Sequence, residues 1–254
     1  MPSAYNQKWN PQHSLITGAS SGLGAGLAQG LSAPGKMLTL TARRAEQLNA
    51  TAHACRDLGA TVVETVADVR DREAMHEIVQ TADQTQPLDL VIANAGIGGG
   101  PGITPEDVYA VNMDGVRHTV EPALAVMEPR CAGQIAIMSS LAGFRGMPSA
   151  PAYAASKAFA RAYGEGLETR YRGSGIAISV ICPGFVTTPM TAANPFPMPF
   201  LMPEEKARAI MLRGLAKRRA RIAFPWPTYA FCALLPILPA SLVNRLLGGQ
   251  ASKE

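Results

Sequence analysis

The sequence has few charged residues and no large excess of either sign. Only 17% of the 254 residues are charged, against 47% that are hydrophobic, and the formal net charge is +4. This composition excludes an intrinsically disordered chain, which needs high charge and low hydrophobicity. Apart from a short basic cluster at Lys217, Arg218, Arg219 and Arg221, the cations are scattered. We therefore predict no nucleic-acid partner.

Cysteine is also scarce. The four cysteines form no C-x-x-C pair, and no histidine lies at metal-ligand spacing from them. We expect free thiols in a reducing compartment and no metal site. The first ten residues contain no apolar run typical of a signal peptide, so the predicted location is cytoplasmic.

What the chain does contain is a regular alternation of short apolar runs and longer helical stretches. Several runs are apolar throughout, which is typical of parallel strands that are covered on both faces. The pattern predicts one α/β domain over residues 1–254, with a doubly wound (Rossmann-like) parallel sheet and helices on both faces. Strands are expected near 14–17, 37–41, 61–67, 88–93, 133–138 and 176–182. Helices are expected near 22–31, 45–58, 72–84, 104–128 and 152–173.

A glycine-rich turn follows the first predicted strand directly. Glycines let backbone N–H groups approach a pyrophosphate, and the next helix points its positive end at that anion. A glycine-rich loop without a ligand is the alternative interpretation, but the strand-turn-helix context favours phosphate binding. The candidate residues of this turn are Gly18, Ser20, Ser21, Gly22, Leu23 and Gly24.

The spacing of this turn, T-G-x-x-x-G-x-G, resembles that of the short-chain dehydrogenase/reductase family. The resemblance extends over roughly residues 12 to 190. It implies a nicotinamide cofactor, and the remaining motifs of the family are matched one by one below.

The end of the second predicted strand bears on the choice of cofactor. Ala42 stands where NAD-preferring members of the family typically carry an aspartate, and Arg43 and Arg44 follow. A guanidinium suits a ribose 2′-phosphate, so we predict NADP(H) in preference to NAD(H). Arg43 is the stronger candidate. Arg44 has the alternative of lying in solvent.

Two further family motifs follow the third and fourth strands. Asp68 and Val69 match an acidic-hydrophobic pair beside the adenine, with a turn-forming aspartate as the alternative. Asn94, Ala95 and Gly96 match the family's N-A-G, which implies structural support for the cofactor site.

Tyr153 and Lys157 lie one helical turn apart on one face of a predicted helix. A free tyrosine has a pKa near 10, and a nearby ammonium lowers that value, which suits proton transfer. Ser140, just beyond the fifth strand, is placed to bind the substrate oxygen; Ser139 is the adjacent alternative. The resemblance implies that Asn112 holds a water linked to the lysine, although a polar residue within a helix can also simply bend it.

Residues 183–188 match the family's P-G-x-V-x-T. The resemblance implies that this segment holds the nicotinamide carboxamide, through the backbone of Val186 and the hydroxyl of Thr188. Pro183 and Gly184 complete the set of cofactor candidates.

These motifs together predict an NADP(H)-dependent oxidoreductase that exchanges a hydride with a carbonyl or secondary alcohol, with tyrosine as general acid/base. One alternative is a membrane-peripheral enzyme that acts on lipid or steroid-like compounds. Another is a non-catalytic NADP-binding sensor, but such proteins typically lack the tyrosine or the lysine.

Two segments depart from the pattern of the family. Residues 187–205 are rich in Pro and Met and predict a loop over a hydrophobic substrate, with ordinary packing as the alternative. Residues 225–247 are apolar but interrupted by prolines, so we expect no spanning helix. Peripheral membrane contact beside the basic cluster, a substrate lid, packing and subunit assembly remain open. We favour a homodimer formed through the long helices near 104–128 and 152–173.

Overall fold

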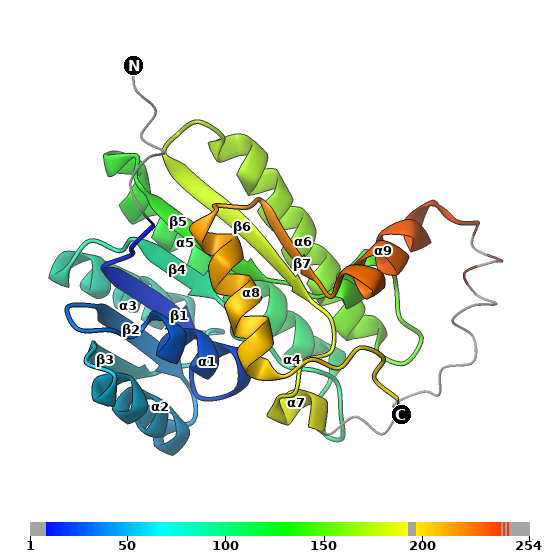
Figure 1. The fold of residues 1–254 in the computed structure, drawn as a ribbon, viewed down its shortest axis with the longest axis horizontal. Helices are drawn as coiled ribbons and strands as arrows, with labels where there is room; N and C mark the ends of the chain where they lie inside the picture. Colours follow the sequence, from blue (N-terminus) through cyan, green and yellow to red (C-terminus); the bar gives the residue numbers. More distant parts are fainter. Residues whose placement is uncertain (1–8, 193–196, 240, 242, 244–254) are drawn as a thin grey trace.

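A computed structural model describes residues 9–192, 197–239, 241 and 243. Its centre is a sheet of parallel strands in the order β3-β2-β1-β4-β5-β6-β7 (Figure 1). The order reverses between β1 and β4, which is the topological switch point where ligands bind in open α/β sheets. The strands are β1 (His13–Thr17), β2 (Met37–Ala42), β3 (Thr61–Val66), β4 (Leu90–Ala93), β5 (Gly133–Met138), β6 (Ile176–Pro183) and β7 (Arg221–Phe224).

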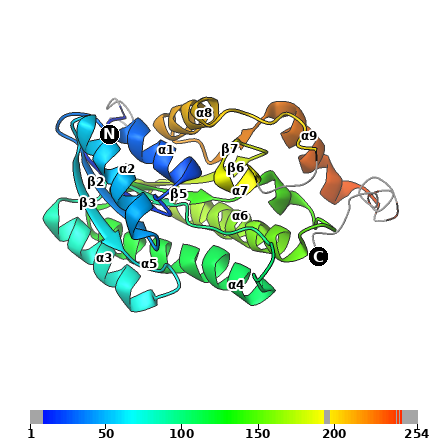
Figure 2. The ribbon, with the colours of Figure 1, turned by 90° about the horizontal axis from the view of Figure 1, so that it is seen from below.

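Helices cover both faces of the sheet (Figure 2). On one face pack α1 (Gly22–Leu31), α2 (Ala45–Asp57) and α8 (Glu204–Ala216). On the other pack α3 (Arg72–Thr85), α5 (Gly115–Met127) and α6 (Pro151–Tyr171). Each face has its own apolar core, and β1 and β4 are buried along their whole length. The predicted doubly wound fold is confirmed.

The six predicted strands and five helical stretches are all present, with ends that differ by a residue or two. The exception is the stretch near 104–128, which is three elements in succession. These are α4 (Pro105–Tyr109), the π-helical turn η2 (Ala110–Asp114) and α5. Hydrophobic periodicity shows no such break because the chain stays helical throughout.

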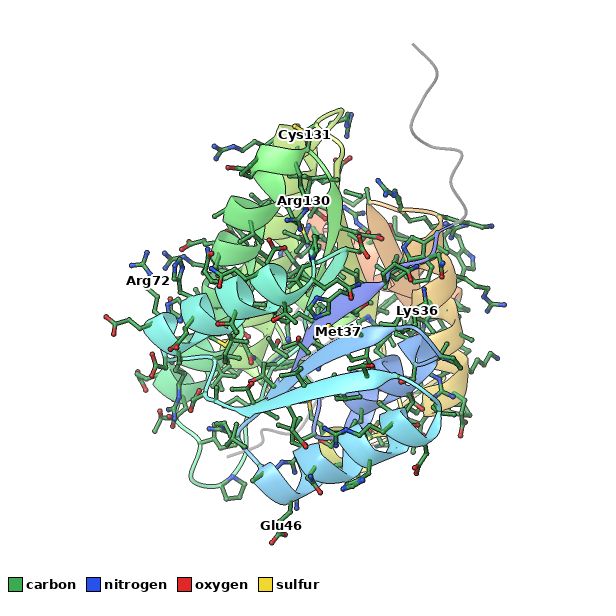
Figure 3. All side chains as sticks on the ribbon, turned by 90° about the vertical axis from the view of Figure 1, so that its left-hand side faces the viewer. Lys36, Met37, Glu46, Arg72, Arg130 and Cys131 are labelled. Carbon is green, nitrogen blue, oxygen red and sulfur yellow. The ribbon has the colours of Figure 1, made fainter. Side chains whose placement is uncertain are left out.

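Figure 3 gives the direction of the strands. Lys36 and Met37 mark the amino end of β2, and Glu46 lies in the first turn of α2, beyond the carboxyl end of that strand. The glycine-rich turn after β1 and the turn after β2 therefore lie at the same edge of the sheet, since the two strands are parallel.

The C-terminal part of the chain was not assigned to strand or helix from sequence. Residues Arg221–Phe224 pair with β6 as a seventh strand, and α9 (Trp226–Leu234) and η5 (Leu235–Ile237) follow. Lys217, Arg218 and Arg219 of the basic cluster precede β7, whereas Arg221 of the same cluster donates to the Tyr229 hydroxyl of α9 at 3.2 Å. Residues 240, 242 and 244–247 of the apolar segment lie outside the described residues.

Within the described part of the chain, no helix has the length and hydropathy needed to cross a membrane.

Candidate active site

The glycine-rich turn after β1 has a backbone that only small residues permit. Gly18 and Gly22 have φ angles of +66° and +53°, in the left-handed region that favours glycine. A Cβ atom on Gly18 would lie 2.7 Å from the Cα atom of Ala95, and one on Gly24 would overlap the Gly18 carbonyl oxygen. The turn therefore packs directly against the start of the loop after β4.

The N-terminus of α1 opens onto this turn. Ser21 is its N-cap residue but makes no side-chain capping hydrogen bond. The first N–H groups of a helix have no partner within the helix, so they remain available to an anion. Leu23 packs against the core and anchors the first turn of α1. The turn thus forms a cradle at which an anion can meet the N-terminal N–H groups of α1.

Asn94 joins β4 to β1. Its amide nitrogen donates to the carbonyl oxygens of Thr17 at 2.9 Å and Gly18 at 3.3 Å. The Thr17 hydroxyl in turn accepts from the backbone N–H groups of Asn94 and Ala95. Because the Asn94 side chain is used in this way, it supports the glycine turn. Gly96 has no side chain that would occupy the space beside Lys157 and Asn112.

The two arginines after β2 have different partners. The Arg44 guanidinium donates to the hydroxyls of Ser20 at 3.1 Å and Ser21 at 2.6 Å. Arg43 lies 3.7 Å from the Asp68 carboxylate, and 53% of its side chain is exposed. Arg44, for which solvent was one interpretation, is therefore the arginine that contacts the glycine-rich turn.

Asp68 is held by cations. Arg70 donates to its carboxylate at 2.7 and 2.9 Å. Burial alone would raise the pKa of Asp68, but the hydrogen bonds from Arg70 and the charge of Arg43 hold it below its usual value. The neighbouring Val69 is buried, and a Cβ on Gly115 would lie 2.5 Å from its side chain. Both residues lie where the sequence predicted them, after β3.

The hydroxyls of Ser139 and Ser140 have different partners. The Ser139 hydroxyl is buried and donates to the Lys157 carbonyl oxygen at 2.7 Å. The Ser140 hydroxyl donates to the Pro183 carbonyl oxygen at 3.4 Å and accepts from the N–H of Ala142 at 3.1 Å, and its interaction with the Tyr153 phenol acts to lower the pKa of that group. The structure brings together the serine and the tyrosine as the sequence predicted.

Lys157 is 3% exposed and lies behind the tyrosine. Its ammonium nitrogen donates to the Met138 carbonyl oxygen at 3.1 Å and lies 5.7 Å from the centre of the Tyr153 ring. Burial lowers the pKa of Lys157 to about 8. Burial also raises the pKa of Tyr153, against the opposing effect of Ser140. The pKa of Tyr153 therefore lies above its usual value and not below it as expected, because loss of solvation dominates.

Asn112 is fully buried in the π-helical turn η2. Its amide oxygen accepts from the N–H of Ile97 at 2.8 Å, and its amide nitrogen donates to the Ile97 carbonyl and to the Ser156 hydroxyl. A Cβ on Gly96 would lie 3.2 Å from the Asn112 oxygen and 3.1 Å from the Lys157 nitrogen. Asn112 and Lys157 therefore converge beneath Gly96. Ser156, which the sequence did not single out, fixes the asparagine.

The segment after β6 contains a second residue that the sequence did not single out. Thr191, in α7 (Pro189–Ala192), donates its hydroxyl to the Val186 carbonyl at 2.6 Å and accepts from the N–H of Thr188 at 2.9 Å. Thr188 also lies against Gly22 of the glycine-rich turn. Thr191 thus fixes both groups assigned to the carboxamide. A T-x-x-T capping spacing was the only signal in the sequence.

Pro183 ends β6, and the N–H of Gly184 donates to the Phe224 carbonyl at 2.7 Å. A Cβ on Gly184 would lie 3.0 Å from Pro225. The two residues therefore bind this segment to β7.

Comparison with known proteins agrees with this geometry. Residues 12–196 match the family model described as short chain dehydrogenase. The chain belongs to the short chain dehydrogenase family. It is an oxidoreductase of that family.

Two similar oxidoreductases match over nearly their full length. A protein of Myxococcus xanthus (strain DK1622), described as an uncharacterized oxidoreductase, is 38% identical over 237 residues, which cover 91% of this chain and 94% of the relative. A Mycobacterium tuberculosis (strain ATCC 25618 / H37Rv) protein with the same description is 33% identical, over 92% of this chain and 96% of the relative.

Solved structures of the family superpose well. A short-chain dehydrogenase from Sphingobium yanoikuyae in complex with NADPH has a TM-score of 0.79 at 25% identity, covering 94% of this chain and 98% of that one. An enzyme from Burkholderia phymatum in complex with NAD has a TM-score of 0.79 at 24% identity, over 91% and 94% of the two chains, and shows the shared fold.

Proposed function

We propose that this dehydrogenase is NADP(H)-dependent and exchanges a hydride between nicotinamide and a carbonyl or secondary alcohol of a hydrophobic substrate. The observation that carries the proposal is the convergence of Ser140, Tyr153, Lys157 and Asn112 at the carboxyl edge of the sheet, beside the glycine cradle. The S. yanoikuyae relative in complex with NADPH supports a nicotinamide cofactor.

The roles of the side chains follow from their contacts. A bound nicotinamide would supply or accept the hydride. The Tyr153 hydroxyl donates a proton to the substrate oxygen in reduction, and Ser140 hydrogen-bonds to the same oxygen. Lys157 places a positive charge behind the phenol, and Asn112 fixes the backbone near Gly96.

The protonation state of Tyr153 favours one direction of the reaction. A phenol is protonated at neutral pH, so the proton that reduction requires is in place, and burial raises the pKa of Tyr153, which makes the phenolate still harder to form. Oxidation of an alcohol instead needs the phenolate. We therefore expect reduction to dominate near neutral pH and oxidation to gain as pH rises.

The preference for NADP(H) rests on the turn after β2. Ala42 provides no carboxylate for a ribose hydroxyl, and both following residues are arginines. Arg44 contacts the serines of the phosphate cradle, while part of the charge of Arg43 is balanced by Asp68. A 2′-phosphate between the cradle and this turn would meet two guanidinium groups.

The cofactor test is equilibrium binding of NADPH and NADH to the purified wild type and to Arg43→Ala and Arg44→Ala. Loss of one charge-assisted contact should weaken NADPH binding by about tenfold or more while NADH binding changes little. Equal losses for both nucleotides would overturn the preference for NADP(H).

The catalytic test is Tyr153→Phe, with Tyr163→Phe on the same helix as the matched control. We expect Tyr153→Phe to remove nearly all turnover of ketones and to leave NADPH affinity unchanged. Tyr163→Phe should keep both the ketone turnover and the NADPH affinity of the wild type. Turnover of Tyr153→Phe at the wild-type level would refute the role of the phenol.

A hydrophobic substrate is favoured by the segment after β6. Met202 pairs with the backbone of Phe185 and Thr187, which fixes the far end of this loop, and Met190, Phe200 and Leu201 are exposed on it. Residues 193–196 of the loop lie outside the described residues. Apolar and flexible side chains at this position suit a bulky apolar substrate.

A membrane-peripheral enzyme is the second candidate. The observation that favours it is that Trp226, Phe231, Leu234 and Ile237 of α9 and η5 are exposed. Cosedimentation with neutral and anionic vesicles tests it, with Trp226→Ser/Ile237→Ser as the comparison. Recovery of the wild type in the supernatant with both vesicles would exclude this candidate.

A homodimer through α5 and α6 remains our proposal for assembly, to be tested by light scattering.

A further inference from the structure

A second cavity lies on the flank of α6, beside the catalytic residues. Its volume is about 550 Å³, which is within the range of small-molecule sites. It opens to solvent and is lined by η4 (Leu141–Phe144), the loop that follows, and the first turns of α6. Most of its lining is apolar, including Phe144, Met147, Pro151 and Ala158. Such a lining suits an apolar ligand.

One lining residue carries a charge that the rest of the cavity does not balance. Arg145 is half-buried, and it makes no ion pair or hydrogen bond with any residue in the described part of the chain. The cavity is lined by no Asp or Glu residue. A guanidinium at an apolar wall without a partner favours the binding of an anion there.

The other arginine of the cavity shows the contrast. Arg161 pairs with Glu165 at 3.0 Å, donates to the Gly143 carbonyl at 3.2 Å and stacks on Phe144 with its guanidinium carbon 4.8 Å from the ring centre. Its charge is paired with Glu165, which Arg221 also contacts, and its Nε and Nη1 atoms are hydrogen-bonded. Arg145 is therefore the lining arginine whose charge has no partner among the described residues.

The cavity is separate from the catalytic centre but adjacent to it. Tyr153 and Lys157 lie on the face of α6 toward the sheet, whereas Ala154 and Ala158, the next residues in sequence, line the cavity. Successive helical residues are about 100° apart, so the two sites occupy neighbouring flanks of one helix. Ser140 begins the segment that continues into the cavity wall.

We propose that this cavity binds an apolar carboxylate and that Arg145 pairs with its acid group. The carboxylate belongs either to the acid end of a substrate or to a separate apolar acid. Its binding does not depend on the proposed hydride transfer and is measured without turnover.

The test is calorimetric titration of the purified full chain with decanoate and with decanol, a neutral probe of the same chain length. The wild type should bind decanoate about tenfold or more tightly than decanol, as a charge-assisted hydrogen bond requires. Arg145→Ala should remove that difference and keep decanol binding. Arg145→Lys should keep part of the preference for decanoate over decanol.

Arg172→Ala, an exposed arginine that follows α6 and pairs with Glu168, is the matched control and should behave as the wild type. Equal affinity for the two probes in the wild type, or a preference that survives Arg145→Ala, would overturn the proposal. Inhibition kinetics then identify the source. Decanoate that competes with a ketone substrate indicates the acid end of the substrate, and noncompetitive inhibition indicates a separate ligand.

Discussion

Replacing Lys157 by methionine should make the ligand-free protein more stable at neutral pH, although it removes a residue proposed for catalysis. The lysine is 3% exposed, and burial lowers its pKa from 10.5 to about 8. At pH 7 the side chain is therefore protonated in an environment that disfavours its charge. Methionine has a similar length and carries no charge.

The magnitude follows from the pKa and from the one hydrogen bond that is lost. A shift between these two values corresponds to about 3 kcal/mol of destabilisation by the protonated lysine. Losing the hydrogen bond from its nitrogen to the Met138 carbonyl costs about 1 kcal/mol. The free energy of unfolding of Lys157→Met should therefore exceed that of the wild type by about 2 kcal/mol at pH 7.

The pH dependence has a definite sign. Between pH 8 and 10.5 the unfolded chain binds more protons at this lysine than the folded chain, so the stability of the wild type rises with pH across that window. Above pH 10.5 the lysine is largely deprotonated in both the folded and the unfolded chain, so the buried charge no longer destabilises the protein. The advantage of Lys157→Met should therefore vanish, or reverse by about 1 kcal/mol from the lost hydrogen bond.

The assay is urea unfolding of both proteins without ligand, at pH 7 and near pH 10.5, analysed as the difference between them so that other titrations cancel. Lys206→Met, at an exposed position of α8, is the control and should change stability little at either pH. A variant less stable than the wild type at pH 7, or a difference independent of pH, would refute the reasoning.

Three further substitutions test the packing of the site. Asn94→Ala removes the amide that joins β4 to β1 and should lower the free energy of unfolding by about 1–3 kcal/mol and weaken NADPH binding, as measured by urea unfolding and titration. Gly164→Ala should destabilise the protein, because the new Cβ would lie 2.5 Å from a Val180 methyl group, whereas Gly166→Ala meets open space and should stabilise it by up to about 1 kcal/mol. Thr191→Val should raise the dissociation constant of NADPH, because it removes the hydrogen bonds that hold the N–H of Thr188 and the carbonyl of Val186.

Matched variants separate these effects from general destabilisation. Asn49→Ala removes an exposed amide that bonds to Glu64 and should leave the free energy of unfolding nearly unchanged. Thr191→Ser keeps the hydroxyl and should restore nucleotide affinity. If Thr191→Ser is as weak as Thr191→Val, the hydroxyl has no positioning role. If Gly164→Ala and Gly166→Ala change stability equally, the close contact on α6 is not what constrains the glycine.

Much of the fold could be predicted because its signals are local. The strand β4 is apolar throughout and β5 ends in an apolar run, and the turn at Gly18 follows a strand and opens a helix. The strand at Arg221–Phe224 escaped prediction because it is short and begins with an arginine, and only its pairing with β6 makes it a strand. The break in the helix at Ala110–Asp114 likewise depends on the contacts of Asn112 with Ile97 and Ser156.

The sequence identified the candidate residues, but it did not show which of them lie against one another. The sequence by itself determined the glycine turn, the succession of strands and helices, and the placing of Tyr153 and Lys157 on one helical face, since each depends on neighbours along the chain. Only the tertiary structure decided that Ser140 lies beside the tyrosine, that Arg44 contacts the glycine turn, and that burial raises the pKa of the tyrosine. Those outcomes depend on segments distant in sequence and on the exclusion of solvent, neither of which a local pattern contains.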